Sequence, residues 1–126
     1  KYHIIRATLE SIAYQVNDVL TAMKADSGIE LSSLKVDGGA SANNLLMQMQ
    51  ADISGAPVNR PVCVETTAMG AAYLAGLSVG YWKSTSDIRK NWSVDRTFDP
   101  EISQNERDSK VRMWKKAVSY SFNWDK

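Results

Sequence analysis

The feature that most constrains the fold is the segment at residues 36–44, which reads VDGGASANN. The apolar run that leads into it predicts a strand, and the residues after the glycine pair favour the start of a helix. Gly38 and Gly39 have no Cβ atom, so a ribose or a phosphate can approach their backbone closely. The N–H groups of a following helix turn also attract an anion. The segment therefore predicts an α/β fold. It also indicates a nucleotide as the ligand, and ATP is the first candidate.

The same segment is also compatible with an ordinary tight turn between a strand and a helix. The spacing from Gly38 to Asn43 matches neither the phosphate-binding loop that ends in lysine nor the three-glycine dinucleotide loop. The segment has no lysine that could reach a terminal phosphate. Asp37 is either a turn residue that accepts N–H groups of the loop or a direct participant in nucleotide or metal-water binding.

Residues beyond the loop extend the pattern over nearly the whole chain. Asn43 and the residues up to Gln48 are followed by DISG at 52–55 and by ETTAMGAA at 65–72. Together with DGGA at 37–40, these segments resemble the glycerol kinases of the FGGY carbohydrate kinase family. The opening segment HIIRATLE at 3–10 resembles the latter half of the second FGGY pattern. The resemblance runs from residue 3 to about Trp124, and we expect the chain to be a fragment of a longer protein.

Two positions favour glycerol over a sugar as the substrate of the parent enzyme. Related sugar kinases tend to have a third glycine where this chain has Asp37. They also tend to have Trp-x-Gln where this chain has Leu46, Met47 and Gln48. The resemblance therefore implies an ATP-dependent enzyme that transfers the γ-phosphoryl group to glycerol, giving sn-glycerol 3-phosphate and ADP. Another FGGY sugar kinase, or a non-catalytic nucleotide-binding or interaction module, remains an alternative.

The resemblance also implies a fold and a site. It implies the C-terminal portion of an actin-like, hexokinase-like ATPase domain of the ribonuclease H-like type, helix-rich with a small sheet, over residues 1–126 as one domain. Gly39 matches the family's glycine against the nucleotide and Asn43 its asparagine near the purine, with Gly38 and Ala40 as neighbours. In the family, the catalytic aspartate, the glycerol site and the first phosphate loop lie in the N-terminal domain. We therefore expect no catalytic residue here, Mg²⁺ ligands outside this chain, and no activity of the isolated chain.

The reactive side chains agree with an incomplete site. His3 is the only histidine, which gives no basis for a Ser-His-Asp triad or a histidine-rich metal site. Four carboxylates could in principle act as a general base or a magnesium ligand, but no pair of them is placed by sequence at one strand end: Asp37, Asp52, Glu65 and Asp87.

Composition excludes several classes of protein and partner. The 15 basic and 14 acidic residues are dispersed, so we expect no nucleic-acid partner. No run approaches the roughly 18 apolar residues of a membrane helix, and no signal peptide is visible, so we expect no membrane partner and a cytoplasmic location. The single cysteine, Cys63, excludes an internal disulfide and is expected to be a small buried hydrophobe in a strand at 62–64.

Periodicity predicts the elements of the first half. A helix is expected over about 3–25 and should end at Gly28, with an inward stripe of Ile5, Leu9, Ile12, Val16, Val19, Leu20 and Met23. A short strand at 34–36 precedes a second helix, opened by Ser41 or Asn43 and stopped by Gly55 and Pro57. That helix should direct a second set of side chains inward: Leu45, Leu46, Met49 and Ile53. A strand is also expected at 58–60.

The second half is predicted as two helices separated by a surface excursion. Thr66 or Thr67 should cap a third helix, whose small-residue face can lie close to a sheet or another helix: Ala68, Ala72, Ala75 and Gly76. Residues 81–98 should run over the surface, with a turn of helix near 86–91 and an extended stretch at 94–98. Ser103 and Glu106 form a capping box that opens a final helix with an apolar stripe: Val111, Trp114, Val118 and Phe122. So few strands leave an edge and apolar faces uncovered, and we expect a homo-oligomer.

Overall fold

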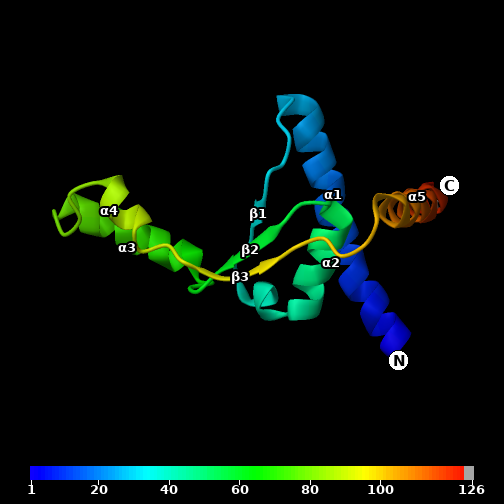
Figure 1. Ribbon diagram of the computed structural model, residues 1–126, viewed down its shortest axis with the longest axis horizontal. Helices are drawn as coiled ribbons and strands as arrows, with labels where there is room; N and C mark the ends of the chain where they lie inside the picture. Colours follow the sequence, from blue (N-terminus) through cyan, green and yellow to red (C-terminus); the bar gives the residue numbers. More distant parts are fainter. Residues whose placement is uncertain (124–126) are drawn as a thin grey trace.

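The protein was studied as a computed structural model that describes residues 1–123, so Trp124, where the resemblance ends, lies outside the described residues. Helices and strands alternate along the chain, as an α/β fold predicts (Figure 1). The elements are α1 (Tyr2–Ser27), β1 (Leu34–Lys35), the 3-10 helix η1 (Gly39–Ala42), α2 (Asn44–Ser54), β2 (Val58–Pro61), α3 (Thr66–Ser78), α4 (Thr85–Arg89), β3 (Val94–Phe98) and α5 (Gln104–Ser121).

The two N-terminal helices lie against each other, and α2 crosses the middle of α1 (Figure 1). As predicted, α1 ends at Gly28, whose left-handed φ of 68° lets its N–H donate to the Lys24 carbonyl. Fully buried Ala13 lies where the helices meet, in a cluster with Met49 and Ile53. A small side chain at this position allows the two backbones to approach.

The predicted stripe of α1 is only partly buried. Three of its members lie in partly buried positions: Leu9, Val16 and Leu20. The other four are exposed to solvent, contrary to the prediction: Ile5, Ile12, Val19 and Met23. The reason is that α2 and α5 together cover only part of a helix of 26 residues.

The sheet has three strands in the order β1-β2-β3. Strand β2 pairs in parallel with β1 and antiparallel with β3, so Val58 lies between Leu34 and Phe98. Val58 and Phe98 are buried against Leu46 and Met47 of α2, which forms the main core of the molecule. The prediction for α2 is right for Leu46, Met49 and Ile53, whereas Leu45 lies off that stripe in the first turn and is exposed.

One prediction about the sheet is wrong and another is incomplete. Residues 62–64 form no strand, because the chain turns away after Pro61, and Cys63 is exposed rather than buried. Residues 94–98 are extended, as predicted, but they do not simply run over the surface: they form strand β3, which pairs with β2. The partner strand is about 35 residues away in sequence, for example at Asn59↔Thr97, so local periodicity gave no sign of the pairing.

Residues 62–93, which we call the arm, project away from the sheet and carry α3 and α4 (Figure 1). None of residues 62–93 is buried. The small-residue face of α3 therefore does not pack on the sheet as predicted; only Gly76 is closely covered, by the Trp82 ring. Tyr73 and Tyr81 contact the same indole edge to face, at 5.1 and 4.7 Å between ring centroids. The aromatic residues of the arm thus pack on one another.

Helix α5 packs where α1 and α2 meet, with Val111 against the cluster of Ala13, Met49 and Ile53. Ser103 accepts the Glu106 N–H at 3.2 Å, so Ser103 caps this helix as predicted. The reciprocal half of the capping box is not among the described hydrogen bonds, and the Glu106 carboxylate lies near Lys110 instead. The Trp114 indole stacks on Tyr14 with 5.3 Å between ring centroids and donates to Asp18 at 2.7 Å. Burial, assisted by the nearby Glu10 charge, raises the pKa of Tyr14. Phe122, predicted on the inner stripe, lies beyond the end of the helix and is exposed.

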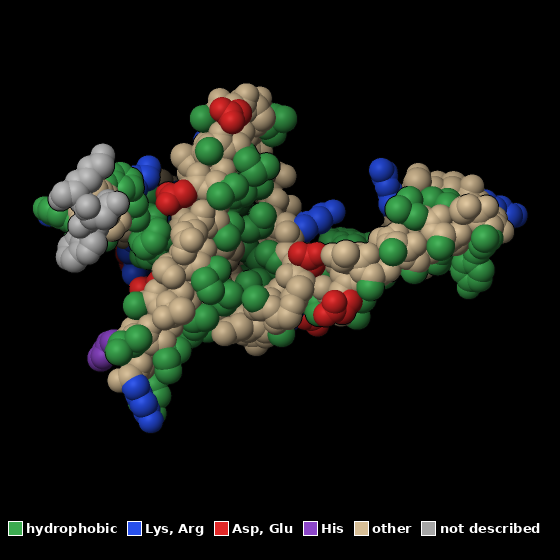
Figure 2. All heavy atoms as spheres, turned by 180° about the vertical axis from the view of Figure 1, so that it is seen from behind, with side chains coloured by type: hydrophobic (Ala, Val, Ile, Leu, Met, Phe, Trp, Pro, Cys, Tyr) green, Lys and Arg blue, Asp and Glu red, His purple; other side chains and the backbone are tan. Residues whose placement is uncertain are grey.

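Exposed apolar residues gather on two parts of the molecule. Figure 2 shows them along the long helix α1 and over the arm; the most exposed include Tyr2, Ile4, Ile29, Leu74, Val79 and Tyr81. No helix among the described residues is long and apolar enough to span a membrane.

Candidate functional site

The predicted loop connects β1 to α2 through a single turn of 3-10 helix. Gly38 has a φ of 77°, a left-handed conformation that favours glycine, and its N–H donates to the Val64 carbonyl at 2.7 Å. The Ser41 hydroxyl is buried and donates back to the Gly38 carbonyl at 2.7 Å. The turn is thereby closed by a hydrogen bond within it. The positive φ alone accounts for a glycine at position 38.

Neither the backbone conformation nor the packing requires a glycine at position 39. Its φ lies outside the left-handed region, and a Cβ atom added there would meet no atom within 4 Å. The space beside its backbone is open to solvent, and Ala40 next to it is exposed as well. A glycine that the chain itself does not need leaves room for a close approach by a ligand.

Of the two predicted helix starts, Ser41 and Asn43, the structure has Asn43 as the N-cap of α2. Its Oδ1 accepts the N–H groups of Leu45 and Leu46 at 3.0 and 3.2 Å, a typical N-cap. Within residues 1–123, its side-chain amide donates to no other group, so this donor is free for a ligand. The structure thus brings Gly38, Gly39, Ala40 and Asn43 together at one exposed turn.

Asp37 connects this turn to the arm. Its carboxylate accepts a hydrogen bond from the Thr66 hydroxyl at the start of α3. The predicted turn role is not seen, because the donor is a distant hydroxyl rather than an N–H of the loop. Thr66 does not cap α3 as predicted; the N-cap is Glu65, without a side-chain bond.

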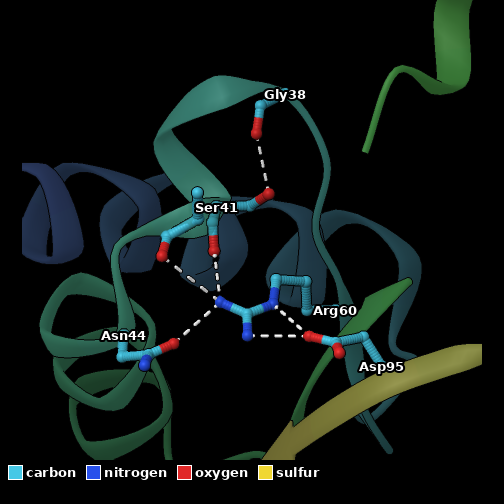
Figure 3. A network of polar contacts seen from close by, with 6 residues as sticks. Gly38, Ser41, Asn44, Arg60 and Asp95 are labelled. Carbon is cyan, nitrogen blue, oxygen red and sulfur yellow. Dashed lines mark hydrogen bonds and ion pairs between the residues drawn. The ribbon is translucent and has the colours of Figure 1, made fainter. Parts of the chain in front are cut away.

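Arg60 is a residue of this region that the sequence did not reveal. It lies on β2, and its guanidinium reaches the carbonyls at the end of η1 on one side and Asp95 of β3 on the other (Figure 3). Its side chain is only 13% exposed. Its acceptors lie 16 to 35 residues away in sequence, so no local pattern could have indicated the contact.

Two of the other predicted carboxylates are engaged in structural contacts. Asp52 accepts from the Gln48 side chain and from the Glu101 N–H, at 3.1 and 2.7 Å. Hydrogen bonds, first from Lys90 and then from Ser84, hold the pKa of Asp87 below its usual value. In the described part of the chain, no group of three or more His, Cys, Asp or Glu side chains could hold a metal ion.

Comparison with known proteins supports this fold. Residues 1–79 match the C-terminal domain of the FGGY family of carbohydrate kinases. The chain is 77% identical, over all 126 residues, to 25% of the glycerol kinase of Agathobacter rectalis. The crystal structure of the Plasmodium falciparum glycerol kinase with ADP superimposes with a TM-score of 0.85 at 36% identity, covering 95% of this chain and 24% of that one.

A more distant structure shares the fold. The xylulose kinase of Lactobacillus acidophilus superimposes with a TM-score of 0.77 at 17% identity, covering 98% of this chain and 26% of that one. The chain spans about a quarter of the length of the relatives it matches. The expected helix-rich α/β fold with a small sheet is confirmed. The chain belongs to the FGGY family of carbohydrate kinases and is similar to the C-terminal part of glycerol kinases.

Proposed function

We propose that this chain is part of an ATP-dependent glycerol kinase, which transfers the γ-phosphoryl group of ATP to glycerol and gives sn-glycerol 3-phosphate and ADP. The observation that carries the proposal is the 77% identity to the A. rectalis glycerol kinase across the whole chain. The proposal includes a cytoplasmic enzyme, as the sequence analysis expects. Below, the full-length kinase means a chain of the relatives' length that contains residues 1–126.

In this proposal, residues 1–126 form the adenosine side of the ATP site. Gly39 leaves its backbone open, so a ribose can lie against it, while Gly38 and Ala40 shape the turn on either side. The Asn43 amide can donate to a purine nitrogen while its oxygen keeps α2 capped. A nucleoside held in one orientation also fixes the direction of its phosphates. Phosphoryl transfer depends on such positioning of the reacting groups.

The terminal phosphate and the metal need groups from the rest of the full-length kinase. Phosphoryl transfer requires Mg²⁺ to offset the charge of the phosphates and a carboxylate that acts as the base and receives the hydroxyl proton. The residues described here do not fit a Mg²⁺ site, and the loop has no lysine. We therefore assign the metal ligands, the glycerol site and the catalytic base to the remainder of the polypeptide.

A coupled ADP-release assay on the full-length kinase tests the proposed reaction. Glycerol, xylulose and gluconate are each supplied with MgATP, and the product is identified by mass spectrometry. We expect turnover with glycerol and formation of glycerol 3-phosphate. Turnover with a sugar but not with glycerol would identify a different FGGY kinase. ATP binding without turnover on any acceptor would favour the non-catalytic module.

A further inference from the structure

We infer that Arg60 is a positioning residue for nucleotide binding: it holds the turn of Gly39 and Asn43 at a fixed place on the sheet. This inference rests on the proposed function of that turn. Arg60 itself touches no part of the exposed edge formed by Gly39 and Ala40. Its effect on a nucleotide would therefore pass through the backbone of η1 and the start of α2.

The contacts of Arg60 surround Asn43 on both sides. Its Nη1 donates to the Ser41 carbonyl at 3.0 Å and more weakly to the Ala42 carbonyl at 3.4 Å, just before Asn43. The same nitrogen donates to Oδ1 of Asn44 at 2.8 Å, just after it (Figure 3). Carbonyl groups at a helix end lack partners within the helix, and a cation there is favourable. One guanidinium thus fixes the junction at which Asn43 lies.

The other side of the guanidinium is anchored to the sheet. Nε and Nη2 contact Oδ2 of Asp95 at 2.8 and 2.7 Å (Figure 3). A guanidinium is planar and presents its donors in a rigid fork, so fixing one edge also orients the other. Asp95 lies on β3, outside the residues that match the family model. The position of the turn is therefore coupled to a strand that the family pattern does not include.

The chain offers a matched control for this inference. Arg96 is the register partner of Arg60 on β3 and has the same charge. Both guanidinium groups lie over the Phe98 ring, at 4.5 Å for Arg96 and 5.3 Å for Arg60 from the ring centroid. Among the described contacts, Arg96 makes none with the turn. Replacing Arg96 removes a charge and a ring contact while leaving the turn anchored.

The experiment compares variants of the full-length kinase by steady-state kinetics, by ATP titration calorimetry and by thermal melting. We expect Arg60→Ala to raise the KM and the Kd for ATP by roughly 5- to 30-fold, since several hydrogen bonds to a charged group are lost. The KM for glycerol should change less than about twofold, because binding is lost on the nucleotide side only. Arg96→Ala should leave both constants within about twofold by the same reasoning.

Three further variants extend the test, and the two single ones keep it informative if Arg60→Ala folds poorly. Arg60→Lys keeps the charge but cannot contact the turn and Asp95 together, so it should also weaken ATP binding. Asp95→Asn should give a smaller effect in the same direction. In the double variant Arg60→Ala/Asp95→Asn, ATP binding should be no weaker than in Arg60→Ala, because both residues act through one anchor.

The outcomes separate this inference from the proposed function. If Asn43→Ser weakens ATP binding and Arg60→Ala and Arg60→Lys do not, the inference is wrong and the adenosine site stands. If all three leave ATP binding unchanged, the adenosine assignment fails and the inference fails with it. A lower melting temperature and kcat with an unchanged KM for ATP would show that Arg60 serves stability alone.

Discussion

The part of the molecule around α2 and the arm at residues 62–93 differ in how their apolar residues are used. The first part, which we call the body, consists of α1, α2, the sheet and α5 and contains every buried hydrophobic residue of the described chain. The arm contains none, although Leu74 and Val79 are apolar and 71% and 80% exposed. The body therefore supplies the stability of the fold, whereas the arm exposes surface that a folded protein normally covers.

The candidate site lies between these two regions and is attached to both. Arg60 holds it to the body, while Val64 and Thr66 bind Gly38 and Asp37 from the base of the arm. Gly39, Ala40 and the Asn43 amide, in contrast, are exposed and make no described contact with the rest of the chain through a side chain donor or a Cβ position. The inner groups of the turn therefore hold it in place, while its outer groups are free to bind a ligand. Stability and binding should then respond to different substitutions.

The largest effect is expected when residues 1–126 are tested alone. Without the groups that hold the terminal phosphate, the isolated chain should show no glycerol-dependent ADP release, and its Kd for ATP should be on the order of millimolar or weaker. The exposed apolar surface should make it a dimer or larger species. Light scattering with the coupled assay checks both, and either measurable turnover or a stable monomer would contradict the account.

The next largest effect is a loss of stability, which we expect for a substitution in the core and not for one in the arm. Phe98→Ala should lower the free energy of unfolding of the isolated chain by about 3–5 kcal/mol, because it removes a buried aromatic ring. Leu74→Ala in the arm should change it by less than about 0.5 kcal/mol. Urea denaturation followed by circular dichroism measures both. Equal losses would mean that the arm is packed as tightly as the body.

Asn43 separates capping from binding at the boundary of the two regions. In the full-length kinase, Asn43→Ala removes both the cap and the amide, so it should lower the melting temperature and raise the KM for ATP about two- to tenfold. Asn43→Ser keeps a capping oxygen and should raise only the KM. Kinetics with each substrate varied provides the check. A KM for glycerol that rose as much as that for ATP would refute the adenosine assignment.

The smallest effect is a local response of the arm to acid. The folded pKa of Asp87 is lowered, so its contribution to α4 is present above the usual value of 3.8 and is lost as the pH falls through the lower folded value. Amide hydrogen exchange at decreasing pH should show α4 opening while α2 stays protected. Asp87→Asn should abolish this step, and a variant with an unchanged profile would assign the opening to another group.

Local signals in the sequence predicted much of the fold. Gly28 and Gly55 end α1 and α2 in the left-handed conformation, and Asn43 and Ser103 cap α2 and α5 as expected. These features depend on a few neighbouring residues, so a single sequence reveals them. The turn of Gly38 and Asn43 was found for the same reason.

Features that depend on distant partners were missed. The exposed half of the α1 stripe and the small-residue face of α3 are apolar patterns without a described partner, so the pattern alone overestimated their burial. Strand β3 and the role of Arg60 depend on pairing across more than 30 residues. One signal was available in retrospect: Arg60 and Asp95 are opposite charges on two segments with strand-like sequences.

The most direct test of the account is the ATP affinity of Gly39→Ala in the full-length kinase, with Gly38→Ala as its control. A Cβ at Gly39 meets no atom of this chain, so the melting temperature should stay the same or rise slightly, while the Kd for ATP rises by roughly tenfold or more. Gly38→Ala should instead lower the melting temperature, because of its positive φ. A Gly39→Ala enzyme that binds ATP as tightly as the parent would contradict the claim that the nucleotide lies against this backbone.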